Sequence, residues 1–175
     1  MVAGKIFINL YAMKQLLHEY AAYNVWANRQ ITNVLAQFAT EKLTMQNGSS
    51  FGSIYGTLVH LMETERSWWQ RIHLQERIVL PERDMQEEVL PVVKLLLESS
   101  AEWLTWIQQA KERQLEHVFG YHNSKKEYFK QPVYQVLLHV FNHQTFHRGQ
   151  IITMLRQQGA DKLPNTDFIT FSRKK

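Results

Sequence analysis

The chain of 175 residues has no cysteine, only four proline and seven glycine residues, and no apolar run that approaches the length of a bilayer-spanning helix. Without cysteine, a disulfide scaffold, a thiolate metal site and a cysteine nucleophile are excluded, so histidine and carboxylate side chains must hold any metal. Because 45% of the residues are hydrophobic, the composition excludes a disordered protein and favours one compact domain over residues 1–175. We expect no membrane partner.

The balance of charge gives little reason to expect a nucleic-acid partner. The formal net charge is +4, from 20 basic and 16 acidic residues, and three of the basic residues, Arg173, Lys174 and Lys175, end the chain. We interpret these three as a solvated tail rather than as a surface for a polyanion. Near the other end, Asn9 interrupts the apolar run that follows Lys5 and no small-residue cleavage site follows, so we predict no signal peptide and a cytoplasmic protein.

Four segments with helical periodicity predict an all-α fold. They cover about residues 12–38, 53–73, 87–114 and 132–159. On the first of them, Leu16 falls on the apolar face and Trp26 on the opposite, exposed side. Residues 115–129 have no helical period and contain Gly120, so they predict a long connection with short extended pieces. The expected architecture is an antiparallel four-helix bundle with a long connection between its third and fourth helices.

Three histidines are predicted to point into this bundle from two of its helices. With about 100° per residue, His147 falls inside the apolar arc of the last helix, His143 at the edge of that arc, and His60 at the boundary of the arc of the second helix. Two imidazoles one turn apart can share a metal, and a third from a facing helix completes three nitrogen ligands. Such a site leaves a coordination position open, which is typical of catalytic metals. The alternative is that these are core histidines with hydrogen-bond partners.

Five further polar residues are predicted to lie near this site. Glu65 falls at the centre of the apolar arc of the second helix, where an unpaired carboxylate would be very costly. We expect an ion pair to Arg148; an acceptor for a histidine ligand and a catalytic carboxylate are the alternatives. Asn24 and Asn28, one turn apart on the first helix, are expected to be hydrogen-bonded inside the bundle or to contact substrate. His139 lies at the margin of the arc and is included in the candidate pocket.

Several enzyme classes lack their motif in this chain. There is no HExxH of the two-histidine zinc proteases and no Glu-x-x-His pair of the ferritin-like di-iron centres. Glycine-rich phosphate loops and a G-x-S-x-G elbow are absent too.

Four segments together resemble the DinB family of bacterial damage-inducible proteins, within the DinB/YfiT-like metalloenzymes. They are YNVWAN (residues 23–28), SSFGSIYGTLVHL (49–61), LHVFNHQTFHRGQ (138–150) and LPNTDFITF (163–171). The resemblance covers almost the whole chain and is specific at HxxxHRGQ; the similarly named DNA polymerase is a different protein. It implies a four-helix bundle that binds one divalent metal, zinc or nickel, through His60, His143 and His147. It also implies a homodimer, which an exposed Trp26 would suit.

The resemblance also implies an activity. Related members are S-transferases or an isomerase that use bacillithiol, mycothiol or glutathione, and others are metal-dependent hydrolases. Because this chain has no cysteine, a thiol would have to enter as a cosubstrate. Our first hypothesis is transfer of a small thiol to an electrophilic small molecule, and the second is metal-dependent hydrolysis. The third is a non-catalytic metal-binding stress protein, which would need a closing fourth ligand such as Glu63 or Glu65.

The sequence departs from the family pattern at two positions and at its start. Phe146 stands where many relatives have a histidine directly before HRGQ, and Glu65 stands where the second helix commonly has aspartate. Relatives tend to begin near a segment such as MKQLLHEYAAYN. Met13 therefore competes with Met1 as the start, and residues 1–12 are then an N-terminal extension without function.

Overall fold

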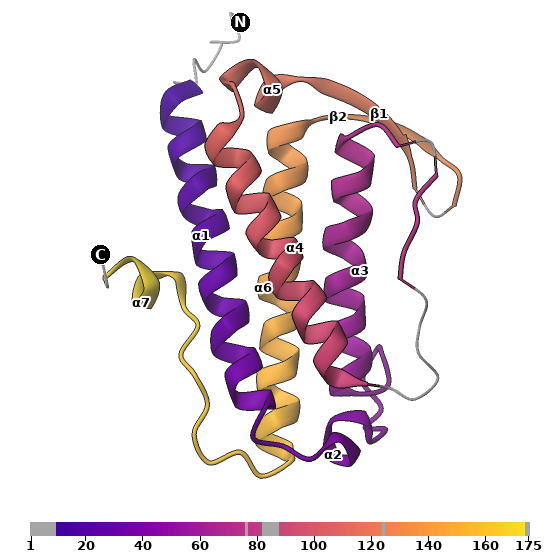
Figure 1. The fold of residues 1–175 in the computed structure, drawn as a ribbon, viewed down its shortest axis with the longest axis vertical. Helices are drawn as coiled ribbons and strands as arrows, with labels where there is room; N and C mark the ends of the chain where they lie inside the picture. The colour runs from indigo at the N-terminus through magenta and orange to yellow at the C-terminus, as the bar shows by residue number, and fades with distance from the viewer. Residues whose placement is uncertain (1–9, 76, 82–87, 124, 174–175) are drawn as a thin grey trace, which may run out of the picture.

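The structure is a computed structural model that describes residues 10–75, 77–81, 88–123 and 125–173. Four long helices form a bundle (Figure 1): α1 (Leu10–Leu35), α3 (Ile54–Ile72), α4 (Val89–Gln109) and α6 (Val133–Gln157). The other described elements are the short helices α2 (Thr40–Thr44), α5 (Glu112–Glu116) and α7 (Phe168–Ser172) and the strands β1 (Val118–His122) and β2 (Tyr128–Pro132). The predicted four-helix bundle is confirmed.

The helix ends follow local signals in the sequence. Ser53 precedes α3, and its hydroxyl accepts a hydrogen bond from the backbone N–H of Gly56 at 3.0 Å, which caps the helix. Pro132 precedes α6, and Gly159, with a φ of +89°, follows it. None of the described helices is apolar enough over a sufficient length to cross a membrane.

Some predicted features lie outside the described residues. These are residues 1–9, the predicted start of the third helix at Glu87, and the tail residues Lys174 and Lys175. Of the predicted N-terminal extension, residues 10–12 form the beginning of α1, and Met13 is buried in the core.

Helices α3 and α4 run in the same direction. One core cluster joins the beginning of α3 to the beginning of α4 through Leu58 and Leu96, and a second joins their ends through Trp68 and Trp103. Figure 1 shows both helices starting at the end of the bundle where α2 lies. The expected antiparallel relation therefore holds for α1 with α4 and for α3 with α6, while α3 and α4 are parallel. Two adjacent parallel helices need a connection that returns along the length of the bundle. Between α3 and α4 this connection is residues 73–88.

The long connection between α4 and α6 contains a β-hairpin. Strands β1 and β2 pair antiparallel, with Gly120 opposite Lys130. Phe119 of β1 is buried in the core cluster at this end of the bundle, whereas Tyr121 packs edge-on against Trp68 of α3 with ring centroids 4.9 Å apart. The hairpin thus brings an aromatic side chain next to the groove between α3 and α6.

The C-terminal helix α7 packs on α1, and two predictions about α1 are wrong. Phe171 lies with its ring centroid 5.6 Å from that of Trp26 and 5.9 Å from that of Tyr23. Trp26 is therefore half-buried rather than exposed, and it no longer supports the homodimer, which stays a prediction. Leu16, expected on the apolar face, is 57% exposed. The periodicity of α1 carries no signal for the distant segment that covers it.

Candidate metal centre

Helices α3 and α6 bring the three predicted histidines together. His60 lies on α3, and His143 and His147 lie one turn apart on α6. Between these helices the buried amide of Gln144 donates a hydrogen bond to the backbone carbonyl of Leu61 at 2.9 Å. This contact fixes the register of the two antiparallel helices at the level of the histidines.

The imidazole nitrogens converge on one point. The Nε2 atom of His143 lies 3.0 Å from Nε2 of His60 and 3.1 Å from Nε2 of His147. One ligand atom from each of the three rings lies within 4.8 Å of the others. Two nitrogens bound at 2.0–2.1 Å to one cation are about 2.9 Å apart at a right angle and about 3.4 Å apart at the tetrahedral angle. The two separations from His143 fall in this range, and the three residues form a cluster that could hold a divalent cation.

The hydrogen bond of His147 and the protonation state of His143 also suit a metal. The Nδ1 atom of His147 lies 2.7 Å from Oε1 of Gln150 and donates to it, which leaves the Nε2 lone pair directed at the cluster. Burial, together with His147 and His60, lowers the pKa of His143 to about 4. His143 is therefore neutral near pH 7, as a ligand must be. Its Nδ1 atom is buried and has no hydrogen-bond partner among the described residues.

Phe51 covers one face of the cluster. Its ring stacks on His60 with a centroid distance of 3.9 Å and an interplanar angle of 17°, and meets the edge of His147 at 5.3 Å. Phe51 lies in the loop between α2 and α3, and its carbonyl oxygen packs against Gly56, where a Cβ would overlap it. The apolar ring keeps water from this side of the histidines.

Among the described residues, no fourth histidine and no carboxylate joins the cluster. Within the part of the chain that the structure describes, the cluster holds three histidines and no carboxylate, so neither Glu63 nor Glu65 belongs to it. Three protein ligands with the remaining positions open is the arrangement of catalytic rather than structural zinc sites. The closing ligand that the non-catalytic hypothesis needs is not found among the described residues.

Glu65 and Arg148 do not form the direct ion pair that the sequence suggested. The fully buried Glu65 carboxylate accepts hydrogen bonds from Nδ2 of Asn24 at 2.8 Å and from Oγ of Ser100 at 3.0 Å. Nη1 of Arg148 donates to Oδ1 of Asn24 at 2.6 Å and to Oδ1 of Asn28 at 2.9 Å. The prediction failed because helical spacing gives the direction of a side chain but not its reach, and an amide can satisfy both charged groups. The expectation that Asn24 and Asn28 are hydrogen-bonded inside the bundle is confirmed.

This buried network supports the site without belonging to it. Burial raises the pKa of Glu65 to about 7, against the hydrogen bonds from Asn24 and Ser100 and the charge of Arg148. Glu65 has no described contact with a histidine of the cluster, so the alternative of an acceptor for a histidine ligand is not observed. Arg148 directly follows His147 in sequence. Its hydrogen bonds to α1 therefore fix α6 at the position of a ligand.

His139 lies beside the cluster rather than in it. Its exposed ring is 5.8 Å from that of His143 and packs edge-on against Trp68 at 5.5 Å. With Trp68 and Tyr121 it lines a pocket of about 250 Å³, which we call the aromatic pocket; Gln131, Gln135 and Val136 complete its wall.

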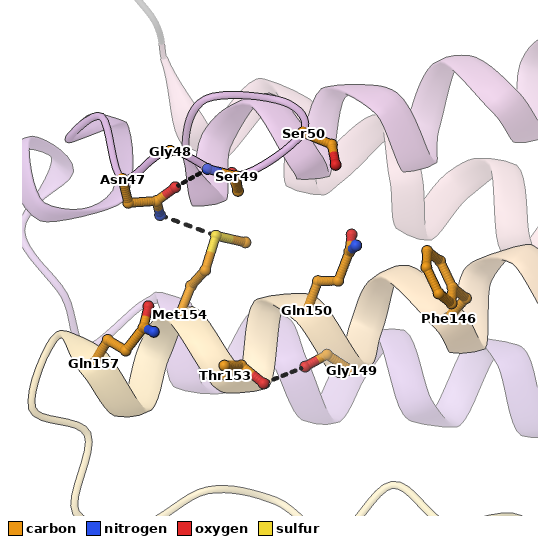
Figure 2. A pocket seen from close by; sticks show the side chains of 10 residues that line it. All are labelled: Asn47, Gly48, Ser49, Ser50, Phe146, Gly149, Gln150, Thr153, Met154 and Gln157. Carbon is orange, nitrogen blue, oxygen red and sulfur yellow. Dashed lines mark hydrogen bonds between the residues drawn. The ribbon is translucent and has the colours of Figure 1, made fainter.

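A second pocket of about 480 Å³ adjoins the cluster on the other side, and we call it the polar pocket (Figure 2). One wall is the loop after α2 and the other is α6. It is lined by Asn47, Gly48, Ser49, Ser50, Phe146, Gly149, Gln150, Thr153, Met154 and Gln157. None of these side chains is charged. Gln150 connects the pocket to the cluster through its hydrogen bond to His147.

Three contributors to the site had no role in the sequence analysis. Gln150 could have been found, because residues three apart on a helix are neighbours and it follows His147 at that spacing. Ser100 lies on α4 within an apolar period and gives no local sign of its contact with Glu65. Phe51 lies in a loop, where no periodicity predicts the direction of a side chain.

Comparison with known proteins agrees with this architecture. The model of the DinB family matches residues 13–174. Protein DinB of Bacillus subtilis (strain 168) is 33% identical over 153 residues, which cover 83% of this chain and 87% of that protein.

Two solved structures from Bacillus subtilis have a similar fold. The crystal structure of the DinB-like protein YjoA aligns with a TM-score of 0.61 and 13% identity, over 85% of this chain and 97% of that one. YfiT, described as a probable metal-dependent hydrolase with an unusual four-helix bundle topology, aligns with a TM-score of 0.57 and 17% identity, over 89% of this chain and 92% of that one.

Proposed function

The chain belongs to the DinB family, and from this premise we propose that it is a metal-dependent hydrolase of uncharged small molecules. The observation that carries the proposal is the convergence of three imidazole nitrogens with no fourth protein ligand among the described residues, beside a pocket without charged side chains. His60, His143 and His147 would hold the cation. YfiT, which shares the fold, is described as a probable metal-dependent hydrolase, and this agrees with the proposal.

In the proposed hydrolysis, the contacts around the histidine cluster give each group its role. Held by His60, His143 and His147, a divalent cation would supply Lewis acidity and would lower the pKa of a bound water molecule. Gln150 keeps the proton of His147 on Nδ1, so that Nε2 stays available to the cation. Phe51 keeps bulk water from one face of His60. In the overall reaction, OH from water joins the acyl carbon, and the leaving oxygen or nitrogen takes the proton.

Transfer of a small thiol stays a prediction. The same open site would serve it, and a thiol would enter as a cosubstrate because the chain has no cysteine. Glutathione carries carboxylates, however, and an anion that gives up hydration on binding is best compensated by a cationic side chain. The polar pocket lining offers no lysine or arginine to such a group. We therefore place hydrolysis first.

The proposal is tested with protein purified without a histidine tag and loaded with zinc or with nickel. Uncharged nitrophenyl esters and anilides report hydrolysis, and monochlorobimane with glutathione reports thiol transfer. We expect metal-dependent ester or anilide turnover that is lost in His60→Ala and kept in His73→Ala. His73 is an exposed histidine whose Nδ1 bonds its own helix at the carbonyl of Trp69.

Each other outcome counts against hydrolysis in a different way. Turnover with the thiol but with no ester or anilide would decide for transfer. Stoichiometric metal without turnover in either assay would decide for a binding protein. Circular dichroism of the His60→Ala variant separates loss of the site from loss of the fold.

A further inference from the structure

The two pockets lie on the same stripe of α6, with the histidine cluster between them. With about 100° per residue, four of the α6 residues that line them, His139, Phe146, Gln150 and Gln157, fall within about 40° of one another. His143 and His147 border this stripe on the side of α3. The aromatic pocket lies toward the beginning of α6 and the polar pocket toward its end.

The polar pocket holds amide donors that have a weak acceptor or none among the described residues. Oε1 of Gln150 accepts a hydrogen bond from Nδ1 of His147. The Nε2 group of Gln150 has no acceptor among the described residues. Nδ2 of Asn47 lies 2.9 Å from Sδ of Met154, and a thioether is a weak acceptor. In Figure 2 the Gln150 amide points from α6 toward the loop that carries Ser50.

The uncharged hydrogen-bond donors of the polar pocket favour a neutral ligand. Amide and hydroxyl donors without a charged neighbour can bind the oxygen of a carbonyl or an amide. A carboxylate or phosphate here would exchange part of its hydration for a lining that holds no cationic side chain.

The aromatic pocket differs in chemistry. Trp68 meets Tyr121 and His139 edge-on, at 4.9 Å and 5.5 Å between ring centroids. The guanidinium of Arg71 lies 4.8 Å from the centroid of the Trp68 ring and fixes it. The volume of about 250 Å³ has room for one ring system. Aromatic walls of this kind bind planar apolar groups by stacking and edge contacts.

We propose that the two pockets are the two ends of one substrate groove, which takes an uncharged, elongated ester or amide with a planar apolar group at one end. His139 and Gln150 are eleven positions apart, which is about 16 Å along the helix. A ligand in both pockets therefore lays its middle across the histidine cluster. The inference rests on the proposed function, since it names the substrate class of that site, but its binding test does not need turnover.

The probe is benzyloxycarbonyl-glycylglycinamide, which has an aromatic ring at one end and a neutral amide at the other. Its free acid and acetyl-glycylglycinamide are the matched compounds without the neutral end and without the ring. Isothermal titration calorimetry is run on metal-free and metal-loaded protein. We expect the probe to bind both forms about five- to tenfold more tightly than either matched compound. Equal binding of the three compounds, or preference for the free acid, would overturn the proposal.

Variants assign each end of the probe to its pocket. Tyr121→Ala is expected to weaken the probe about fivefold and to leave acetyl-glycylglycinamide unchanged; Trp106→Ala, an aromatic change on α4 outside both pockets, is the control. Gln150→Glu keeps an acceptor for His147 but removes the free donor. It should keep the metal and weaken the probe about fivefold. Loss of metal without weaker probe binding would assign Gln150 to the metal alone and overturn its role in the groove.

The two failures are distinguishable. Probe discrimination without turnover of any ester or anilide leaves the groove standing and removes hydrolysis. Turnover of esters or anilides without probe discrimination keeps hydrolysis and removes the groove.

Discussion

Asn24 lies between Glu65 and Arg148 and binds both: its Nδ2 donates to the carboxylate at 2.8 Å, and its Oδ1 accepts from the guanidinium at 2.6 Å. All three side chains are buried. A direct ion pair would need the two charged groups in contact, whereas the amide satisfies each of them from a third helix. One side chain of α1 thus connects α3 to α6 beside the metal ligands.

Asn24→Ala tests how much this connection stabilises the bundle. The change leaves the buried carboxylate with one donor fewer and the buried guanidinium with one acceptor fewer. We expect a loss of about 2–4 kcal/mol in the free energy of unfolding, measured with urea. Asn33→Ala, on the exposed side of the same helix, should stay within about 0.5 kcal/mol of wild type. Equal effects of the two changes would contradict the role given to Asn24.

Glu65→Gln tests the protonation of the buried carboxyl. Its pKa rises from 4.5 to about 7 on folding, so between these values the folded state binds the proton that the unfolded state has lost. The stabilising contribution of the protonated carboxyl is complete below pH 4.5 and is lost as pH rises through 7. The total change is on the order of 3 kcal/mol. Glutamine is neutral at every pH and keeps a donor and an acceptor.

The measurement is the free energy of unfolding at several pH values from about 4.5 to about 9. Relative to wild type, the Glu65→Gln variant should become steadily more stable as pH rises, and the difference should level off above about pH 8. Parallel profiles of the two proteins would show that Glu65 is already ionised in the folded state below neutral pH.

Gly56→Ala tests the loop that lays Phe51 on His60. A Cβ on Gly56 would overlap the backbone carbonyl oxygen of Phe51, so the loop must move away from the beginning of α3. We expect a loss of about 1–3 kcal/mol in stability and weaker zinc retention during dialysis. Gly149→Ala is the control, since nothing lies within 4 Å of the added Cβ. Alanine is the better helix former, so the control should be neutral or more stable by up to about 1 kcal/mol.

Periodicity predicted most of the fold because four long amphipathic helices have few ways to bury their apolar faces. It also predicted that His60, His143 and His147 would meet, since each lies on or next to an inward arc and the two helices are neighbours. It could not predict that α3 and α4 run parallel, because residues 73–88 are long enough for either direction.

Contacts between segments that are distant in the sequence could not be predicted either. The position of Trp26 depends on how α7 returns to α1, and no local pattern in either helix encodes that contact. The partners of Glu65 depend on which neutral side chains reach it from α1 and α4. The sequence thus drew attention to Trp26 and Glu65 but did not identify the residues that contact them.

The central claim is that three histidines, and not the fourth one beside them, hold a divalent cation. Elemental analysis of tag-free protein after incubation with zinc or nickel and gel filtration tests it most directly. Wild type and His139→Ala should each retain about one equivalent of metal, whereas His60→Ala, His143→Ala and His147→Ala should each retain less than about a fifth. Wild type with less than about a tenth of an equivalent, or a His139→Ala variant as depleted as the other three, would contradict the account.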